Sequence, residues 1–313
     1  MDTRLSRGIA CGAAAGALWG LVFLAPQVAG DFGALQLAAG RYLVYGAVAV
    51  LLLAPRWPAA TAAVGRAEWW ALVRLSLLGN IVYYVLLALA VRWAGGAAAS
   101  LIIGLLPVAV TLVGTREAGA LQLRALAGPL ALCVAGVGLV GAEALAMGGD
   151  AADRTRRMAG LLCAFAAMAS WAAYSVVNSR WLARRPDISA HDWSLLTGVV
   201  TGACAVVLAV PAFAPTSGSH GSADWLRFWA VAATVAVLAS VVGNGLWNRA
   251  SRLLPLTLTG QMIVFETLFA LLYGFAWEQR WPSVREALAI VCLIGGVWWC
   301  ARAHRVPATP PAA

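Results

Sequence analysis

Long apolar stretches alternate with short polar segments along the chain, and this pattern predicts its elements. A membrane-spanning helix needs about 20 mostly apolar residues. Ten stretches meet that length, at 7–28, 34–54, 69–91, 96–115, 125–146, 158–181, 192–213, 225–248, 256–276 and 284–303. They are continuously apolar rather than alternating, which is typical of helices and excludes a β-barrel. The pattern predicts an all-α polytopic membrane protein with ten transmembrane helices.

Composition and loop charges set the class of protein and its orientation. Hydrophobic residues make up 62% of the chain and charged residues 11%, outside the range of soluble domains. Of the 22 basic residues, all arginine, fourteen fall on the side of the N-terminus, seven on the other side, and Arg41 within a span. The positive-inside rule therefore predicts cytoplasmic termini. The wealth of Ala, Gly and Arg is typical of a GC-rich bacterial genome, so we expect a multi-pass protein of the bacterial inner (plasma) membrane.

The first half of the chain recurs in the second half. Eight residues between Thr3 and Trp19 recur between Thr155 and Trp171, all displaced by 152 positions. Residues of the second span recur in the seventh at an offset of 156, and later matches lie at 160. Gly79-Asn80 and Gly243-Asn244 are also alike, but their offset of 164 leaves this series, so the pair does not count toward the repeat.

This duplication predicts how the chain is divided. We expect a five-helix repeat at 1–146, a linker at 147–157, a second five-helix repeat at 158–305 and a disordered tail at 306–313. Since five is odd, the second repeat enters the membrane in the opposite direction. Inverted repeats of this kind place a substrate site near the membrane midplane, between the halves, and alternate its access from one side to the other.

Glycines at every fourth position mark one face of the first predicted helix, at Gly8, Gly12, Gly16 and Gly20. Such a face lets another backbone approach closely. The second half keeps only Gly160 of the four glycines, so we expect a close, moving contact at the first helix alone. In the fourth span, Pro107 removes a backbone hydrogen bond and, with Gly104, predicts a hinge.

Several short motifs resemble those of one transporter family. They are Ala17-Leu18-Trp19-Gly20, Gly40-Arg41-Tyr42, Leu105-Leu106-Pro107, Phe265-Glu266-Thr267 and the ending Gly274–Arg280. With ten spans in two sets of five, the chain resembles the EamA-like branch of the drug/metabolite transporter superfamily. Its aromatic enrichment is most similar to the YddG-type aromatic amino-acid exporters. The resemblance implies a transport fold with a central cavity surrounded by spans 1–4 and 6–9, and spans 5 and 10 at the periphery.

Two charged residues lie inside predicted spans. Glu266 is the one carboxylate near the middle of a span, and a charge there costs roughly 2.5–3.5 kcal/mol on insertion scales, so it normally turns toward a cavity or a partner. It is either a substrate anchor or proton-titrating group, or a structural carboxylate held by hydroxyls or an arginine. Arg41 either binds a substrate carboxylate or has a structural role, and we favour the structural role.

Polar and aromatic residues within the spans predict a binding site. Amides in hydrocarbon either bond to a neighbouring helix or face water, and an aromatic pocket suits a flat apolar solute, although ordinary packing is the alternative for each residue singly. The candidate substrate-binding residues are Trp19, Asn80, Tyr83, Tyr84, Ser100, Trp171, Tyr174, Asn178, Asn244, Gln261 and Glu266.

The sequence lacks the marks of other activities. It has no GxxxxGK[ST] loop for ATP, no histidine or cysteine motif for a metal, no nucleophile elbow and no basic nucleic-acid module, so we expect no enzyme and no cofactor. We expect a secondary transporter in the lipid bilayer, as a monomer or homodimer, that exports small metabolites, amino acids including aromatic ones above all. Uptake, efflux of drugs or toxic cations, and a membrane enzyme or scaffold are the alternatives.

Overall fold

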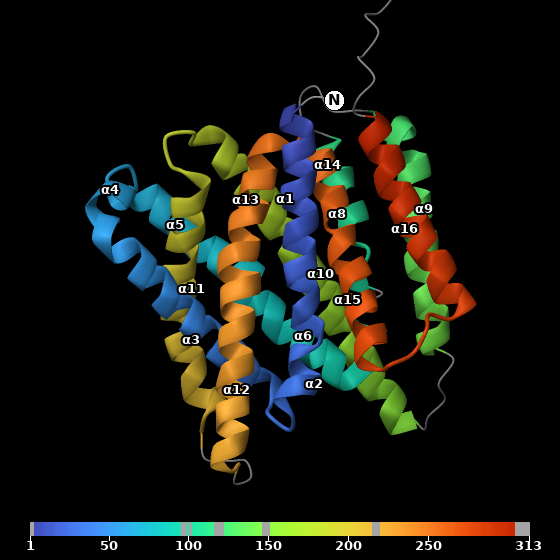
Figure 1. Cartoon of the computed structure of the whole chain (residues 1–313), viewed down its shortest axis with the longest axis horizontal. Helices are drawn as coiled ribbons and strands as arrows, with labels where there is room; N and C mark the ends of the chain where they lie inside the picture. Colours follow the sequence, from blue (N-terminus) through green and yellow to red (C-terminus); the bar gives the residue numbers. More distant parts are fainter. Residues whose placement is uncertain are drawn as a thin grey trace, which may run out of the picture.

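The helices run side by side between two ends of the molecule, and the first and last described helices begin and end, respectively, at the same end (Figure 1). The structure is a computed structural model that describes residues 3–94, 99, 102–115, 122–145, 151–214 and 220–303. Within those ranges all regular secondary structure is helical. This confirms the predicted all-α class.

Eight helices of the described chain, counted with their adjoining short segments, are long and apolar enough to cross a membrane. They are Thr3–Ala29, Ala34–Thr61, Arg66–Ala94, Arg154–Arg184, Ala190–Ala212, Ser222–Leu253, Leu256–Trp277 and Val284–Ala303. Two further apolar helices, α8 (Leu106–Gly114) and α9 (Leu123–Leu145), occupy the remaining predicted stretches.

Most of these segments are interrupted within their length. Their parts in the first half are α1 (Thr3–Gly20), α2 (Ala25–Ala29), α3 (Ala34–Leu53), α4 (Trp57–Thr61), α5 (Arg66–Ser76) and α6 (Val82–Ala94). In the second half they are α10 (Ala151–Arg184), α11 (Ala190–Ala212), α12 (Ser222–Val235), α13 (Asn244–Leu253), α14 (Leu256–Met262), α15 (Val264–Trp277) and α16 (Val284–Ala303).

Two details differ from the sequence-based prediction. α10 begins at Ala151, so residues 151–157 of the predicted linker are helical. Pro107 lies in the first turn of α8, where its missing N–H costs nothing, and the chain turns just before it, at Gly104 and Leu105. The predicted tail 306–313 lies outside the described residues.

Small residues allow the helices to pack at close range. α3 packs along α11, and a side chain on Gly46 would overlap the backbone of Gly202. The glycine face of α1 lies against α14 and α15: a Cβ on Gly16 would come 2.8 Å from the backbone nitrogen of Glu266, and one on Gly20 2.9 Å from that of Ala270. Close packing of helix backbones replaces the hydrophobic effect as the associating force within lipid.

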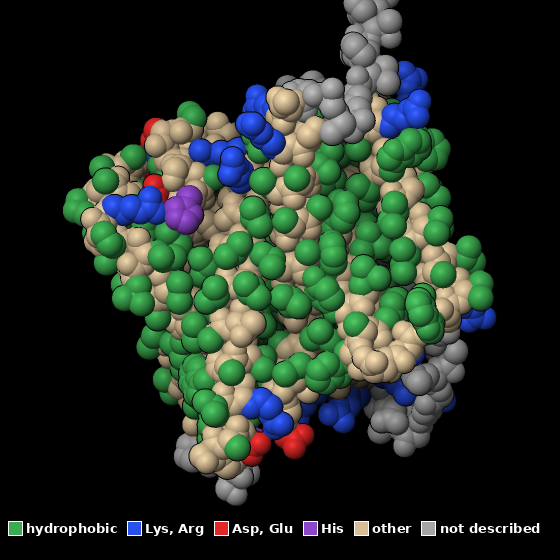
Figure 2. All heavy atoms as spheres, viewed as in Figure 1, with side chains coloured by type: hydrophobic (Ala, Val, Ile, Leu, Met, Phe, Trp, Pro, Cys, Tyr) green, Lys and Arg blue, Asp and Glu red, His purple; other side chains and the backbone are tan. Residues whose placement is uncertain are grey.

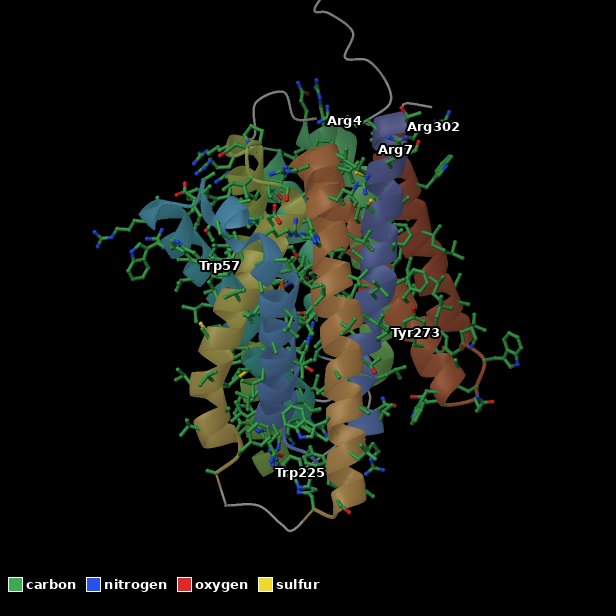
Figure 3. All side chains as sticks on the ribbon, turned by 60° about the vertical axis from the view of Figure 1, so that its left-hand side comes forward. Arg4, Arg7, Trp57, Trp225, Tyr273 and Arg302 are labelled. Atoms are coloured by element: carbon green, nitrogen blue, oxygen red, sulfur yellow. The ribbon has the colours of Figure 1, made fainter. Side chains whose placement is uncertain are left out.

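The outer flank of the bundle is apolar, and charged side chains gather at its two ends (Figure 2). Val207 and Val210 on α11 are 73% and 75% exposed on this flank. One end holds Arg4, Arg7 and Arg302 and is called the terminal end; the other holds Trp225 and the 30–33 loop and is called the far end (Figure 3). This distribution fits a bilayer around the flank, with water at both ends.

Candidate functional site

A small buried cavity lies in the middle of the bundle. Its volume is about 30 Å³, room for about one water molecule. Eleven residues line it: Trp19, Val22, Arg41, Tyr42, Gly79, Asn80, Tyr83, Trp171, Tyr174, Asn244 and Glu266. Seven of these are sequence-predicted substrate-binding residues, and they come from segments up to 247 positions apart, so the fold gathers them into one place.

Two π-helical segments bring Asn80 and Asn244 to the cavity. Leu77–Ile81 joins α5 to α6, and Ala236–Gly243 joins α12 to α13. π-helical turns free backbone carbonyls and are frequent at functional sites. The indole of Trp19 donates to the carbonyl of Ala239 at 3.0 Å, and the hydroxyl of Ser170 donates to that of Leu78 at 2.7 Å. Gly79-Asn80 and Gly243-Asn244, which did not count toward the repeat, thus both lie at a π-helical segment, and both asparagines line the same cavity.

Glu266 reaches the cavity because the helix that carries it is broken. α14 ends at Met262 and α15 starts at Val264, so Glu266 stands in the first turn of α15. Its residue is 8% exposed. The glycine face of α1 permits this placement, since Gly16 lies directly against the Glu266 backbone. A carboxylate in the first turn is favoured by the helix dipole.

Arg41 lines the same cavity. It therefore has access to a bound solute in addition to the structural role that its sequence position favoured. It is 8% exposed, its Nε donates to the Ser240 hydroxyl at 3.0 Å, and its guanidinium carbon lies 5.1 Å from the ring centres of both Tyr42 and Tyr84. The cavity is therefore lined by a guanidinium and a carboxylate on different helices, together with the amides of Asn80 and Asn244.

Two tryptophans, Trp19 and Trp171, line the cavity, and a third, Trp247, packs against both without lining it. The ring centres of Trp19 and Trp171 are 5.6 Å apart, and Trp247 lies 5.2 Å from Trp19 and 5.4 Å from Trp171. Trp247 is fully buried, and sequence reasoning missed it. Its position 164 residues after Tyr83 is the same displacement that relates the two asparagines, so that offset was the signal.

Four predicted residues lie elsewhere. Asn178 accepts from the Trp193 indole at 2.9 Å and donates to Asn248 at 2.8 Å, while Gln261 donates to Thr111 at 3.1 Å. Both therefore bond helices together rather than face the cavity. Tyr84 lines a second cavity, and Ser100 lies outside the described residues.

The second cavity, called the vestibule, opens at the far end. Its volume is about 460 Å³, within the usual range for small-molecule sites. Its walls come from residues 22–37 and from α6, and Val22 borders both this vestibule and the central cavity. The vestibule thus leads from the far end to the edge of the central cavity.

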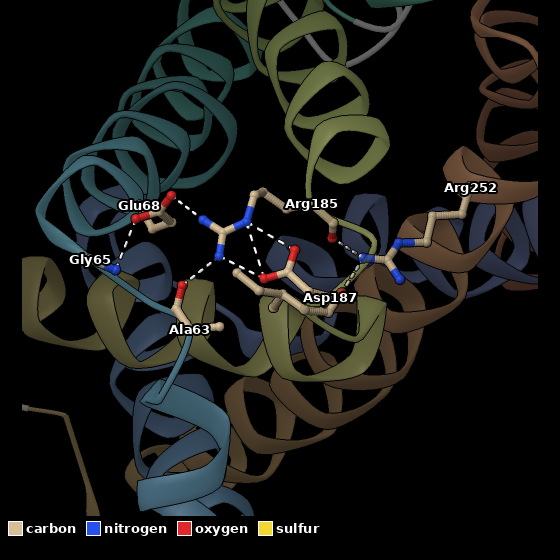
Figure 4. A network of polar contacts seen from close by, with 7 residues as sticks. Ala63, Gly65, Glu68, Arg185, Asp187 and Arg252 are labelled. Carbon is tan, nitrogen blue, oxygen red and sulfur yellow. Dashed lines mark hydrogen bonds and ion pairs between the residues drawn. The ribbon is translucent and has the colours of Figure 1, made fainter.

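Polar bonds close the opposite side of the central cavity. Asn178 lies on α10 between Trp171 and Arg185, and its bonds to Asn248 and Trp193 cross the bundle there. Beyond them, the ionic network of Glu68, Arg185, Asp187 and Arg252 joins separate elements at the terminal end (Figure 4).

Arg185 is the centre of this ionic network. It pairs with Glu68, donates to Asp187 at 2.7 Å and donates to the Ala63 carbonyl at 2.5 Å. Arg252 donates to the carbonyls of Arg185 and Ile188. The guanidinium of Arg185 holds the pKa of Asp187 below its ordinary value of 3.8. The network ties the start of α5 to the α10–α11 loop and to the end of α13.

Comparisons with known proteins place the chain in a family. Residues 158–302 match the profile of the EamA-like transporter family. The chain is 32% identical over 305 residues to "Inner membrane protein YtfF" of Escherichia coli (strain K12), covering 92% of this chain and 93% of that protein. It also resembles a solved structure described only as "Crystal structure of protein", with a TM-score of 0.71 at 23% identity over 97% of this chain and 99% of the other; this likeness bears on the fold alone. The protein therefore belongs to the EamA-like transporter family, as its motifs predicted.

Proposed function

We propose that the protein is a secondary transporter of the bacterial inner membrane that exports small metabolites, with amino acids, aromatic ones included, as its substrates. Family membership supports transport, and the inner-membrane name of the related protein supports the location. The observation that carries the substrate class is the buried cavity with Arg41, Glu266, two asparagines and a tryptophan wall. A zwitterion would find a guanidinium for its carboxylate and a carboxylate for its ammonium group.

Alternating access between two inverted five-helix repeats is the mechanism we infer. The helix pairs support it: α3 packs with α11, α8 with α14 and α9 with α16, while α1 packs with α13 and α6 with α10. These are the pairings expected when one set of five spans is related to the other by a two-fold axis. On this account α8 and α9 complete ten spans, and both termini face the cytoplasm.

A second candidate is efflux of organic cations. The aromatic wall with Glu266 is an arrangement that attracts a cation through the faces of its rings. Arg41 in the same cavity opposes a purely cationic ligand, so we rank amino-acid export first.

Flux into and out of proteoliposomes tests both candidates. We expect transport of labelled aromatic amino acids, and weaker transport of them by Trp171→Ala. Flux of organic cations without amino acids would favour the second candidate, and absence of flux for every solute, with folded protein in the membrane, would contradict transport.

A further inference from the structure

The vestibule at the far end has features of a binding site and not only of a passage. Its volume of about 460 Å³ is comparable with sites that enclose small organic ligands. The central cavity, at about 30 Å³, has no room for such a molecule in this conformation. A solute that meets the protein from the far end therefore encounters the vestibule first.

Two opposite charges stand on the vestibule wall. Asp31 comes from the loop after α2, and Arg92 from the last turn of α6. Neither has a hydrogen-bond or ion-pair partner within the part of the chain that the structure describes, and both are exposed. A carboxylate and a guanidinium that share a cavity without pairing are free to hold the two ends of a zwitterion.

The loop that carries Asp31 is held firmly. Gly30 has a φ of +83°, which favours glycine, and the Arg227 guanidinium lies 2.8 Å from where its Cβ would be. Phe32 is 7% exposed and stacks on His220, with ring centres 4.1 Å apart; it also contacts Phe228 at 4.5 Å. Fixed residues on both sides of Asp31 keep its carboxylate at the wall.

The rest of the wall is apolar and aromatic. Phe23, Phe32 and Tyr84 supply rings, and Leu37 and Leu87 supply aliphatic surface. Tyr84 also contacts the Arg41 guanidinium, and Val22 borders both cavities. A ligand in the vestibule therefore contacts the residues that separate it from the central cavity.

We propose that the vestibule binds a zwitterionic amino acid with a bulky apolar side chain, its carboxylate toward Arg92 and its ammonium group toward Asp31. This inference rests on the proposed transport function for the identity of the solute. The site is separate from the central cavity and is occupied before or after it.

Truncated ligands test which charge each residue recognises. Purified full-length protein in phosphatidylglycerol nanodiscs is titrated with labelled phenylalanine, 3-phenylpropanoate, which lacks the ammonium group, and 2-phenylethylamine, which lacks the carboxylate. Arg92→Gln should weaken phenylalanine and phenylpropanoate about fivefold and leave phenylethylamine unchanged, since exposed charge pairs contribute modestly. Asp31→Asn should weaken phenylalanine and phenylethylamine and spare phenylpropanoate.

The control is Arg285→Gln, which removes an exposed arginine that does not line the vestibule. Equal effects of Arg92→Gln and Asp31→Asn on all three ligands, or no effect of either, would overturn the proposal. Loss of phenylalanine binding when phosphatidylethanolamine is added would also overturn it, because the lipid headgroup carries the same two charges and would then be the ligand of the vestibule. Flux measured on the same variants separates the two proposals: selective binding without flux refutes transport alone, and flux without charge-selective binding refutes the vestibule site alone.

Discussion

The two ends of the bundle are built differently. At the terminal end, the ionic network of Glu68, Arg185, Asp187 and Arg252 joins elements far apart in the sequence, and a layer of asparagine bonds lies beneath it. At the far end, the vestibule of about 460 Å³ extends to Val22, which also lines the central cavity. Under alternating access, this difference corresponds to one of two states, sealed toward the termini and approached from the opposite side.

The nature of the seal also matters. A few charged and polar bonds close the terminal end, and such bonds can be exchanged for water at modest cost. The glycine contacts of α1 with α15 are instead packing of backbone on backbone, which tolerates no added atom. We therefore expect the polar bonds to break during transport and the glycine face to act as the surface on which the helices move.

The largest effect is expected at Glu266, in the cavity between the two ends. Glu266→Gln should reduce flux driven by a proton gradient to below about a tenth of wild type while sparing passive exchange, because an intramembrane carboxylate is the group that can carry the proton. Proteoliposome flux with and without a pH gradient measures it. Glu278→Gln, half-exposed at the far end, is the matched control, and an unchanged pH dependence in Glu266→Gln would refute proton coupling at this residue.

The glycine face gives the next largest effect. Gly16→Ala should destabilise the protein by about 1–3 kcal/mol, since the new methyl group overlaps the Phe265 and Glu266 backbone. A lower Tm in detergent and a loss of flux would report it. Gly274→Ala on α15 is the control, because nothing lies within 4 Å of its added Cβ. Equal Tm values for the two variants would contradict the close contact.

A smaller effect is expected from opening the terminal end. Arg185→Gln removes the centre of the ionic network and should shift the population toward a terminal-end-open state by a few-fold at most, because the pairs are partly exposed. In a chain whose six native cysteines are replaced by alanine, a single cysteine is introduced at Ser175 on α10, whose buried hydroxyl makes no hydrogen bond among the described residues. Its labelling should then become faster. Arg280→Gln breaks an ion pair at the far end instead; if it accelerates labelling equally, the network does not seal that end.

The smallest effect concerns pH. Arg185 keeps the pKa of Asp187 below its ordinary value of 3.8. Because this pKa is lowered, the Arg185–Asp187 pair stabilises the terminal end fully above pH 3.8, the ordinary pKa of the carboxyl group. That stabilisation is lost only as the pH falls through the lowered pKa. The labelling rate itself rises with pH because the thiolate is the reacting form, so the quantity compared is the rate in Arg185→Gln divided by the rate in the parent protein at the same pH. Between about pH 5 and pH 8 this ratio, measured at the cysteine introduced at Ser175, should stay constant. A ratio that changes steeply within this window would show that another group controls the seal.

The sequence predicted which stretches are helical and seven of the residues that line the central cavity. Continuous apolar stretches marked the helices, and the rule that intramembrane charges turn inward identified Glu266. The same rule applied to Arg41, yet only the fold shows that both line one cavity. Val22 and Gly79 have no polar or charged side chain that would identify them as cavity-lining residues. Glu68 and Arg185 pair across 117 positions, and no local sequence pattern reveals such a contact. In sequence, Asn178 and Gln261 resemble Asn80, and only the fold shows that Asn80 lines the central cavity while the other two bond neighbouring helices away from it.

Locking the terminal end tests the central claim most directly. Glu68→Cys and Arg185→Cys are combined in a chain whose six native cysteines are replaced by alanine, and are joined by a short, reducible bis-thiosulfonate cross-linker that spans the length of the lost ion pair. The account predicts that cross-linked protein loses flux, regains it on reduction, and still binds phenylalanine from the far end throughout. Full flux in the cross-linked protein would contradict alternating access through this cavity.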